Sequence, residues 1–254
     1  MTNSGPDTAA LGNRLSDTEY VLQRSRPGYS SLDYLQLKDL YNALASMSSV
    51  FAGDVFDYGC GGAPYRQFFA SCKSYVKADV TPGPMVDRLL AADGLTTEAP
   101  GSYDLVISTQ VLEHVKDPES YLRECHRILQ PGGQVIVTTH GMMHEHGCPD
   151  DFQRWTSRGL EELLSRTGFQ VLDSLKLTTQ IRGAIQLMHH CVPQLRAPDN
   201  VLLHCLFAAF RKGYRWFMVP MLNWVADRFA GQATAPGSSA VSLYTGVCAR
   251  ARRV

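Results

Sequence analysis

Residues 55–64 constrain the fold more than any other part of the chain. Apolar residues lead to Asp57, and three glycines then follow within four positions, at Gly59, Gly61 and Gly62. Such a run is typical of a buried strand that ends in a tight turn and continues into a helix. Glycine lets the backbone turn sharply and leaves no Cβ in the way of a ligand. We therefore expect a nucleotide-type cofactor site at the carboxyl edge of an open sheet.

Two further acidic residues follow the glycine turn. Asp79 ends a second short strand roughly twenty residues beyond Asp57, the separation expected for a ribose-binding carboxylate. Asp93 lies in a turn just before the strand that begins at Tyr103. Each of the two could instead cap its own turn. A cofactor site is favoured because the glycine turn, the two acidic residues and the strands follow one another in this order.

Several motifs stand in the order found in class I S-adenosylmethionine (SAM)-dependent methyltransferases, which the chain therefore resembles. The likeness is strongest to the branch that methylates small molecules, sugars and lipids, and it covers roughly residues 50–175. Ala63 departs from the pattern, because it stands where the family usually has the last glycine of the turn. The motifs are Asp57-Tyr58-Gly59-Cys60-Gly61, Asp79, Asp93, residues 102–107, residues 111–115 and residues 129–133.

The resemblance implies an α/β fold with a Rossmann-like, seven-stranded, mostly parallel sheet, helices on both faces and a final antiparallel hairpin. Hydrophobic periodicity alone indicates only an alternating α/β chain. We expect a disordered tail at residues 1–14, a SAM-binding domain at 15–182 and 237–254, and a helical insertion at 183–236 before the last strand. Helices are expected at residues 16–23, 31–48, 65–72, 117–129 and 156–168, and strands at 75–79, 86–91, 104–109, 134–139, 169–178 and 241–249.

The resemblance also implies how SAM would be held. The backbone of the glycine turn would pass the methionine and ribose parts, and Asp57 would orient the turn or the cofactor's amine. Asp79 would accept hydrogen bonds from both ribose hydroxyls, since a carboxylate carries two acceptor oxygens, and Asp93 would accept one from the adenine amine. The predicted cofactor-binding residues are Asp57, Tyr58, Gly59, Cys60, Gly61, Asp79, Val80, Ala92, Asp93, Gly94, Thr109 and Gln110.

Histidines are the candidates for catalysis. A hydroxyl acceptor must lose its proton as the methyl group arrives, and histidine is suited to accept a proton near neutral pH. His140, at the end of the fifth strand, is the first candidate for the general base, followed by His144. His114, which follows Glu113 after the fourth strand, is a third candidate with either a structural or a catalytic role.

The segment after the fifth strand allows one further interpretation. His144, Glu145 and His146 invite a metal site, but the spacing is a weak signal, and a solvated loop is the preferred interpretation, with no metal predicted. Residues 151–156 match a pattern that relatives often carry after a histidine. There Arg154 is expected to orient the loop by pairing with Asp150 or Asp151.

The charge balance and the cysteine spacing limit which partners and which cellular compartment we expect. Lys plus Arg equals Asp plus Glu, 24 each, so nothing indicates an electrostatic surface for nucleic acid. The seven cysteines form no CxxC pair, which favours a reducing compartment over a disulfide framework or a structural zinc site. The polar N-terminus shows no signal peptide. We expect a cytoplasmic protein; its oligomeric state is left open.

The insertion contains two apolar runs, residues 201–210 and 216–225, which Arg211, Lys212 and Arg215 divide. Neither run is long enough to span a membrane. Three interpretations stay open: a helical cap packed on the sheet edge, a lid over a lipidic or aromatic substrate, or a pair of membrane-surface helices with the basic residues at the headgroups.

The sequence thus predicts a SAM-dependent methyltransferase that acts on an oxygen of a small-molecule, sugar or lipid-linked acceptor. A nicotinamide-dependent oxidoreductase on a similar sheet is the first alternative, disfavoured because Pro64 takes the place of the last glycine of G-x-G-x-x-G. A non-catalytic SAM-binding partner of another enzyme is the second alternative. The fold and the cofactor motifs do not identify the acceptor.

Overall fold

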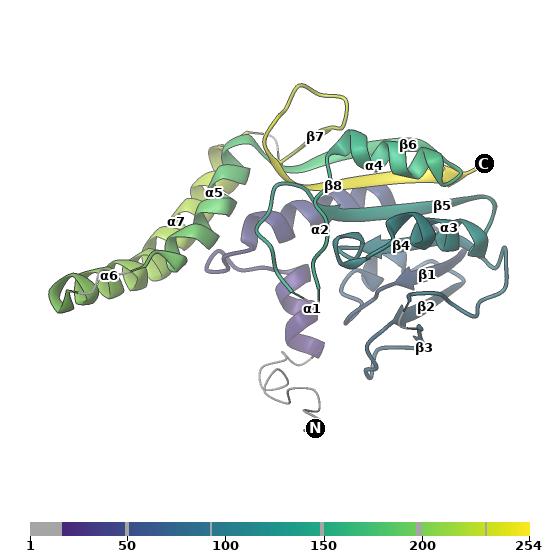
Figure 1. Ribbon diagram of the computed structural model, residues 1–254, viewed down its shortest axis with the longest axis horizontal. Coiled ribbons are helices and arrows are strands. Elements are labelled where there is room, and N and C mark those ends of the chain that lie inside the picture. Colours follow the sequence, from purple (N-terminus) through teal and green to yellow (C-terminus); the bar gives the residue numbers. More distant parts are fainter. Residues whose placement is uncertain (1–16, 49–50, 92, 148–149, 197–199, 232) are drawn as a thin grey trace, which may run out of the picture.

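The computed structural model describes residues 17–48, 51–91, 93–147, 150–196, 200–231 and 233–254 (Figure 1). The predicted disordered tail at residues 1–14 lies outside these ranges, as does residue 16, the expected start of the first helix.

The described residues form one eight-stranded sheet with the order β3-β2-β1-β4-β5-β8-β6-β7. Neighbours from β3 to β5 pair in parallel, whereas β8 is antiparallel to both β5 and β6, so β1 to β6 share one direction. The predicted mostly parallel, Rossmann-like sheet is therefore confirmed. The strands are β1 (Asp54–Tyr58), β2 (Ser74–Asp79), β3 (Arg88–Leu89), β4 (Tyr103–Thr109), β5 (Leu129–His140), β6 (Phe169–Thr179), β7 (Thr234–Pro236) and β8 (Tyr244–Arg253).

The predicted count of seven strands is corrected by β7. This three-residue strand pairs with β6 at the sheet edge, where Pro236 costs no ladder hydrogen bond to a further strand. It lies within residues 183–236, which the sequence analysis expected to be helical. Three other strands differ in extent: the third is only Arg88–Leu89, the fifth begins at Leu129 rather than at residue 134, and the last begins at Tyr244 rather than at residue 241.

Helices cover both faces of the sheet. Along β4, Val106 packs in the core on the side of α3 and α4, whereas Leu105 and Ile107 pack against α2 on the other side, because successive strand residues point to opposite faces. Asp117 caps α3, the helix predicted at residues 117–129, by accepting a hydrogen bond from the backbone N–H of Ser120 at 3.0 Å. The helices are α1 (Asp17–Ser25), α2 (Tyr34–Ser48), α3 (Pro118–Ile128), α4 (Ser157–Arg166), α5 (Gln180–Cys191), α6 (Val201–Gly213) and α7 (Val219–Phe229).

The crossover helix expected at residues 65–72 is only a short 3₁₀ turn, η2 (Arg66–Phe69). The segment between the glycine turn and β2 is short, and 3₁₀ turns are typical of such connections. Tyr65 and Phe69 still bury their rings in the core beside α2.

A nearly continuous helical run projects from the sheet in the lower left of Figure 1, consisting of α6, a π-helical segment η5 (Tyr214–Met218) and α7. The widened π turn precedes Pro220, whose ring removes an N–H and crowds the carbonyl four residues earlier. We call residues 201–229 the arm. In the ranges that the structure describes, no helix has both the length and the apolar character needed to cross a membrane.

Buried polar contacts attach the base of the arm to the sheet domain. Arg182 of α5 donates through Nε to Asp39 Oδ2 of α2 at 3.1 Å and through Nη1 to the carbonyl oxygen of Ala226 in α7 at 2.9 Å. Arg182 is 2% exposed and Asp39 is fully buried. The charge of each partner is therefore compensated mainly by the other.

We expect Asp39→Ala to lower the free energy of unfolding by about 3–5 kcal/mol, because it leaves the buried Arg182 guanidinium with only the more distant carboxylate of Asp227, 3.9 Å away. Asp173→Ala, which breaks the exposed pair with Arg250, is the matched control and should cost at most about 1 kcal/mol. Urea denaturation measures both. Similar losses in the two variants would contradict the importance of the buried pair.

Candidate active site

The glycine turn follows β1 and is held by β2. The backbone N–H groups of Gly59 and Cys60 both donate to the carbonyl oxygen of Ala78, at 2.8 and 2.9 Å. Gly59 has a φ of +78°, and a Cβ there would lie 2.5 Å from Cγ2 of Val111. Ala63 adopts a φ of 50°, a left-handed conformation that costs an alanine about 1–2 kcal/mol. The turn thus keeps its left-handed bend despite the missing last glycine.

Asp57 lies beneath this turn with its side chain buried. Its Oδ2 accepts a hydrogen bond from the hydroxyl of Tyr75 at 2.7 Å, whereas its Oδ1 has no hydrogen-bond partner among the described residues. Burial raises the pKa of Asp57 to about 7. An unpartnered buried carboxylate oxygen is costly, so this position suits a ligand that brings a hydrogen-bond donor or a positive charge.

The predicted ribose and adenine carboxylates both cap local turns. Asp79 accepts from the backbone N–H of Gly61 at 2.9 Å and of Thr81 at 2.8 Å, and Asp93 accepts from that of Leu95 at 3.1 Å. Each carboxylate keeps further lone pairs for a ligand, since two oxygens offer about four acceptor sites. Capping and ligand binding are therefore compatible here.

The remaining predicted cofactor residues lie around these carboxylates. Val80 is half exposed beside Asp79, and the carbonyl oxygen of Gly94 accepts a hydrogen bond from the hydroxyl of Tyr58, which ties the Asp93 turn to the end of β1. Cys60 is buried next to the turn. Ala92 lies outside the described residues.

Gln110 takes a strained backbone conformation where β4 ends after Thr109. Its φ is 55°, and its backbone N–H donates to the carbonyl oxygen of Thr138 at 2.9 Å. Its buried Oε1 has no partner among the described residues. Such strain is concentrated at binding sites, and Val111, the next residue, contacts the glycine turn, so the ends of β1 and β4 adjoin.

His140, the first candidate base, is buried at the end of β5. Its Nδ1 lies 3.1 Å from Nε2 of Gln36, and its Nε2 lies 2.9 Å from Nε2 of His146 and 3.3 Å from Oε1 of Glu113. Burial, followed by the charges of His146 and Arg154, lowers the pKa of His140 to about 3. The ring is therefore neutral at physiological pH, and both of its nitrogens face other side chains.

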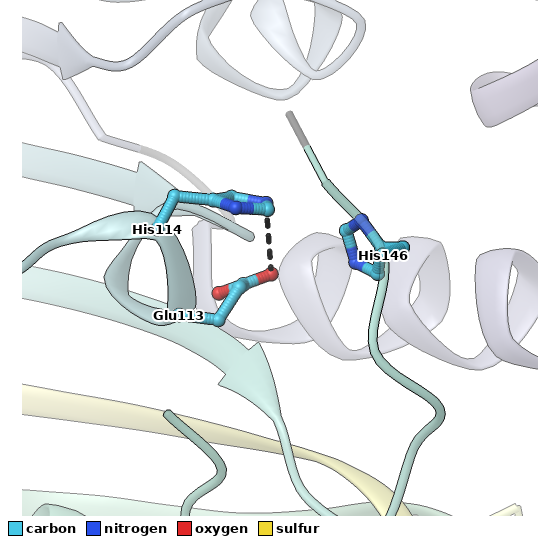
Figure 2. A group of neighbouring side chains, drawn as sticks. All are labelled: Glu113, His114 and His146. Carbon is cyan, nitrogen blue, oxygen red and sulfur yellow. Dashed lines mark ion pairs between the residues drawn. The ribbon is translucent and has the colours of Figure 1, made fainter. Parts of the chain in front are cut away.

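The other two candidate histidines lie in different surroundings. His114 shares the cluster of His140, with its Nδ1 2.6 Å from the carbonyl oxygen of Asp150. His144 instead packs its ring against His190 of α5, with 4.2 Å between centroids, and burial lowers its pKa. Figure 2 shows Glu113 and His114 on one side of the cluster and His146 facing them from the loop after β5.

Arg154 orders the loop that carries these histidines. It pairs with Asp151, one of the two predicted partners, and donates through Nε to the carbonyl oxygen of Met143 at 3.1 Å and through Nη2 to that of His144 at 2.6 Å. The backbone N–H of His146 donates to Oδ2 of Asp151 at 2.8 Å. The expected orienting role of Arg154 is thus confirmed.

Sequence reasoning missed the contribution of α2 and α5. Gln36 reaches His140, while Asp33 binds Nε2 of His190 at 2.9 Å beside His144. Glu113 was singled out only as the neighbour of His114. These contacts join segments far apart in the chain, so no local pattern indicated them.

Comparison with known proteins links the glycine-turn half of the site to a family. Residues 56–137 match the model of a family described as "Methyltransferase domain". The chain is 36% identical over 100 residues to a protein of Pseudomonas paraeruginosa called "Ubiquinone biosynthesis O-methyltransferase", with 34% of this chain and 43% of that protein covered. A protein of the same name from Xanthomonas euvesicatoria is 35% identical, with 34% and 42% covered. The chain thus spans less than half the length of these relatives.

Solved structures show the same fold over most of the chain. A SAM-dependent methyltransferase from Thermotoga maritima superposes with a TM-score of 0.55 at 13% identity, covering 94% of this chain and 95% of that one. Another from Mesorhizobium loti gives a TM-score of 0.51 at 16% identity, covering 86% of this chain and 100% of that one.

We expect Gly59→Ala to destabilise the protein by about 1–3 kcal/mol more than Gly132→Ala. Both residues have a φ near +79°, but only at Gly59 would a Cβ meet a neighbour within 4 Å, so Gly132→Ala isolates the cost of the backbone conformation. Urea denaturation of the two variants measures the difference. Equal losses would show that Val111 moves aside freely.

Proposed function

We propose that this chain, which carries a class I SAM-dependent methyltransferase domain, transfers the methyl group of SAM to a hydroxyl oxygen of a small-molecule, sugar or lipid-linked acceptor. The predicted family and fold are confirmed by the domain match at residues 56–137 and by the superposed structures. The observation that carries the proposal is the glycine turn above a buried carboxylate, Asp57, with one unpartnered oxygen.

The residues of the turn fit SAM. Gly59 gives the turn its left-handed bend and its close packing on Val111, and Oδ1 of Asp57 has no hydrogen-bond partner among the described residues, so it could accept from a donor such as the cofactor's amine. Asp79, at the end of β2, retains lone pairs for the ribose hydroxyls, and Asp93, in the turn before β4, retains them for the adenine amine. When bound, SAM supplies a methyl group whose carbon bonds to the acceptor oxygen as its bond to sulfur breaks, which leaves S-adenosylhomocysteine.

The histidine cluster supports oxygen as the methylated atom. A hydroxyl acceptor releases one proton during the transfer, and His140, with His144 and His114 as the other candidates, is proposed to take it up. The lowered pKa of His140 keeps its ring neutral but also makes it a weak base in the free protein, so the proposal requires a bound acceptor to change its surroundings. The cluster lies at the carboxyl ends of β4 and β5, and β4 neighbours β1 with its glycine turn in the sheet. Ligands in such sheets bind at that edge. The name of the relatives, an O-methyltransferase, agrees with this choice.

The exposed side chains of the arm support two proposals: that the acceptor is lipid-linked, or that the protein binds a lipid surface. No side chain of α6 is buried, and Trp216 and Phe217 are 70% and 76% exposed. Large exposed apolar side chains gathered on one element are typical of a binding surface. Lys212 and Arg215 are exposed between the two apolar runs, where they would meet anionic headgroups. A cap packed on the sheet edge describes α7, which buries Val219 and Ala226, better than it describes α6.

Cofactor binding tests the proposal first. We expect the purified chain to bind SAM and S-adenosylhomocysteine in calorimetry and to give no heat with NADH. Asp79→Ala should weaken S-adenosylhomocysteine by at least roughly tenfold, because two hydrogen bonds to a charged group are lost. Asp173→Ala, an exposed acid on β6, is the control and should bind as the wild type does. No affinity of the wild type for either nucleoside would overturn the proposal.

A turnover assay on the same samples separates an enzyme from a non-catalytic SAM-binding partner. Radiolabelled methyl transfer is measured with phenolic, sugar and lipid-linked hydroxyl acceptors. We expect His140→Ala to keep its affinity for S-adenosylhomocysteine while losing about 100-fold or more in rate. Unchanged turnover in this variant would remove His140 from the reaction.

Co-sedimentation with vesicles tests the role of the arm. We expect the wild type to pellet with phosphatidylglycerol vesicles more than with phosphatidylcholine vesicles. A Trp216→Ser, Phe217→Ser double variant should bind at least roughly tenfold more weakly, since two large apolar side chains are removed. Phe152→Ser, which removes an exposed aromatic outside the arm, is the control. Pelleting that is equal in all three proteins, or absent in the wild type, would contradict membrane contact.

A further inference from the structure

We propose that Glu113, His114 and His146 bind a divalent transition-metal ion, Zn²⁺ in the first place, at the carboxyl ends of β4 and β5. The three side chains come from η3 (Leu112–His114), which follows β4, and from the loop after β5 (Figure 2). One carboxylate and two imidazoles are the donor set of many zinc sites that keep a fourth position open.

The ligand atoms are close enough for one ion. One donor atom from each of the three residues lies within 4.8 Å of the other two, and His114 Nε2 is 4.0 Å from Glu113 Oε1. A tetrahedral ion bonded at about 2.0–2.1 Å holds its ligand atoms about 3.3 Å apart. Small side-chain rotations would therefore close the group on an ion.

Glu113 gives independent support for a cation at this point. Its side chain is fully buried, and its Oε2 accepts a hydrogen bond from Oγ1 of Thr139 at 2.8 Å. Its Oε1 accepts no hydrogen bond of good geometry from the described part of the chain, and the nearest histidine nitrogen, His140 Nε2, lies 3.3 Å away. A buried carboxylate oxygen without a partner is expensive, and a bound metal ion would satisfy it.

The hydrogen bonding of His114 determines which of its nitrogens is available. Its Nδ1 lies 2.6 Å from the carbonyl oxygen of Asp150, and a carbonyl only accepts, so Nδ1 carries the proton. Nε2 then keeps its lone pair, on the side of Glu113. A backbone carbonyl that fixes the far nitrogen of a histidine is the typical outer support of a metal ligand.

His146 is held in place by the loop that Arg154 orders. Its backbone N–H is bonded to Asp151, the partner of Arg154, and its ring meets that of His114 at 5.0 Å between centroids. His140 lies outside the ligand set, with its Nε2 2.9 Å from His146 Nε2. One of these two nitrogens donates to the other, so an ion bound through His146 Nε2 would replace this hydrogen bond. His114 would then be a ligand and not a base.

An open fourth position suits an oxygen donor. In a step that rests on the proposed methyl transfer, it would be taken by the acceptor's hydroxyl, which the ion would orient and make more acidic. The sequence interpretation of His144, Glu145 and His146 as a metal group is replaced here by a different set, because the structure directs His144 to His190 and leaves Glu145 exposed.

The test is metal binding by chelator-treated full-length protein, measured without any turnover. We titrate Co²⁺, follow the visible absorption of the tetrahedral ion, and then displace it with Zn²⁺ in calorimetry. We expect one equivalent in the wild type and at least roughly tenfold weaker binding in Glu113→Gln and His146→Gln. Glu145→Gln, which removes an exposed acid next to His146, is the matched control and should bind as the wild type does.

Each outcome decides one proposal. Co²⁺ binding that is absent in the wild type, or equal in all variants, overturns the metal site. Circular dichroism checks that Glu113→Gln is folded, and His146→Gln, on a loop, decides the matter if it is not. Calorimetry with S-adenosylhomocysteine on the same samples distinguishes the two proposals. Nucleoside binding without Co²⁺ binding would contradict only the metal site. Co²⁺ binding without nucleoside binding would contradict only the methyltransferase proposal.

Discussion

The binding edge of the sheet depends on one close approach, that of the Gly59 backbone to the side chain of Val111. A Cβ on Gly59 would lie 2.5 Å from Val111 Cγ2, so only glycine lets these turns pack together. Val111 follows Gln110, which has a left-handed backbone of its own. Both turns are bonded to the next strand outward, Gly59 to Ala78 of β2 and Gln110 to Thr138 of β5. The carboxyl ends of four adjacent strands are thereby fixed relative to one another, and cofactor and acceptor would meet there.

The parts of the fold that could be predicted are those that local sequence patterns encode. β4 follows from a short apolar run, and helix α3 follows from Asp117, whose side chain accepts a hydrogen bond from the backbone N–H three residues later. The prediction of a crossover helix at residues 65–72 was wrong. Tyr65 and Phe69 bury their rings in a 3₁₀ turn as well as they would in an α-helix, so the apolar pattern does not distinguish the two. β7 could not be predicted, because its three residues become a strand only by pairing with β6, about sixty positions away.

The proposed cofactor and acceptor halves of the site also differ in whether local sequence patterns or long-range contacts define them. The proposed cofactor residues lie within one glycine turn and two nearby acids, so pattern and spacing alone led to that hypothesis. The Arg154–Asp151 pair spans three residues and was predicted in the same way. The acceptor half depends on contacts between distant segments, such as Gln36 with His140, 104 positions apart. Such contacts are set by how α2 and α5 pack, and that packing leaves no periodic trace around His140 or His144.

Unpartnered acceptors at one edge of the sheet connect the two proposals. Asp57 Oδ1, Gln110 Oε1 and Glu113 Oε1 are all buried, and none receives a hydrogen bond from a described residue. All three are oxygens, so what would satisfy them is a donor or a cation and not another acceptor. A buried oxygen left without a partner costs about 1–3 kcal/mol, and more when it is charged. A chain shaped for stability alone would have placed donors or apolar groups there. Since Asp57 lies beneath the turn after β1 and Glu113 after β4, two different ligands, a nucleoside with a cationic group and a metal ion, would relieve the two carboxylates separately.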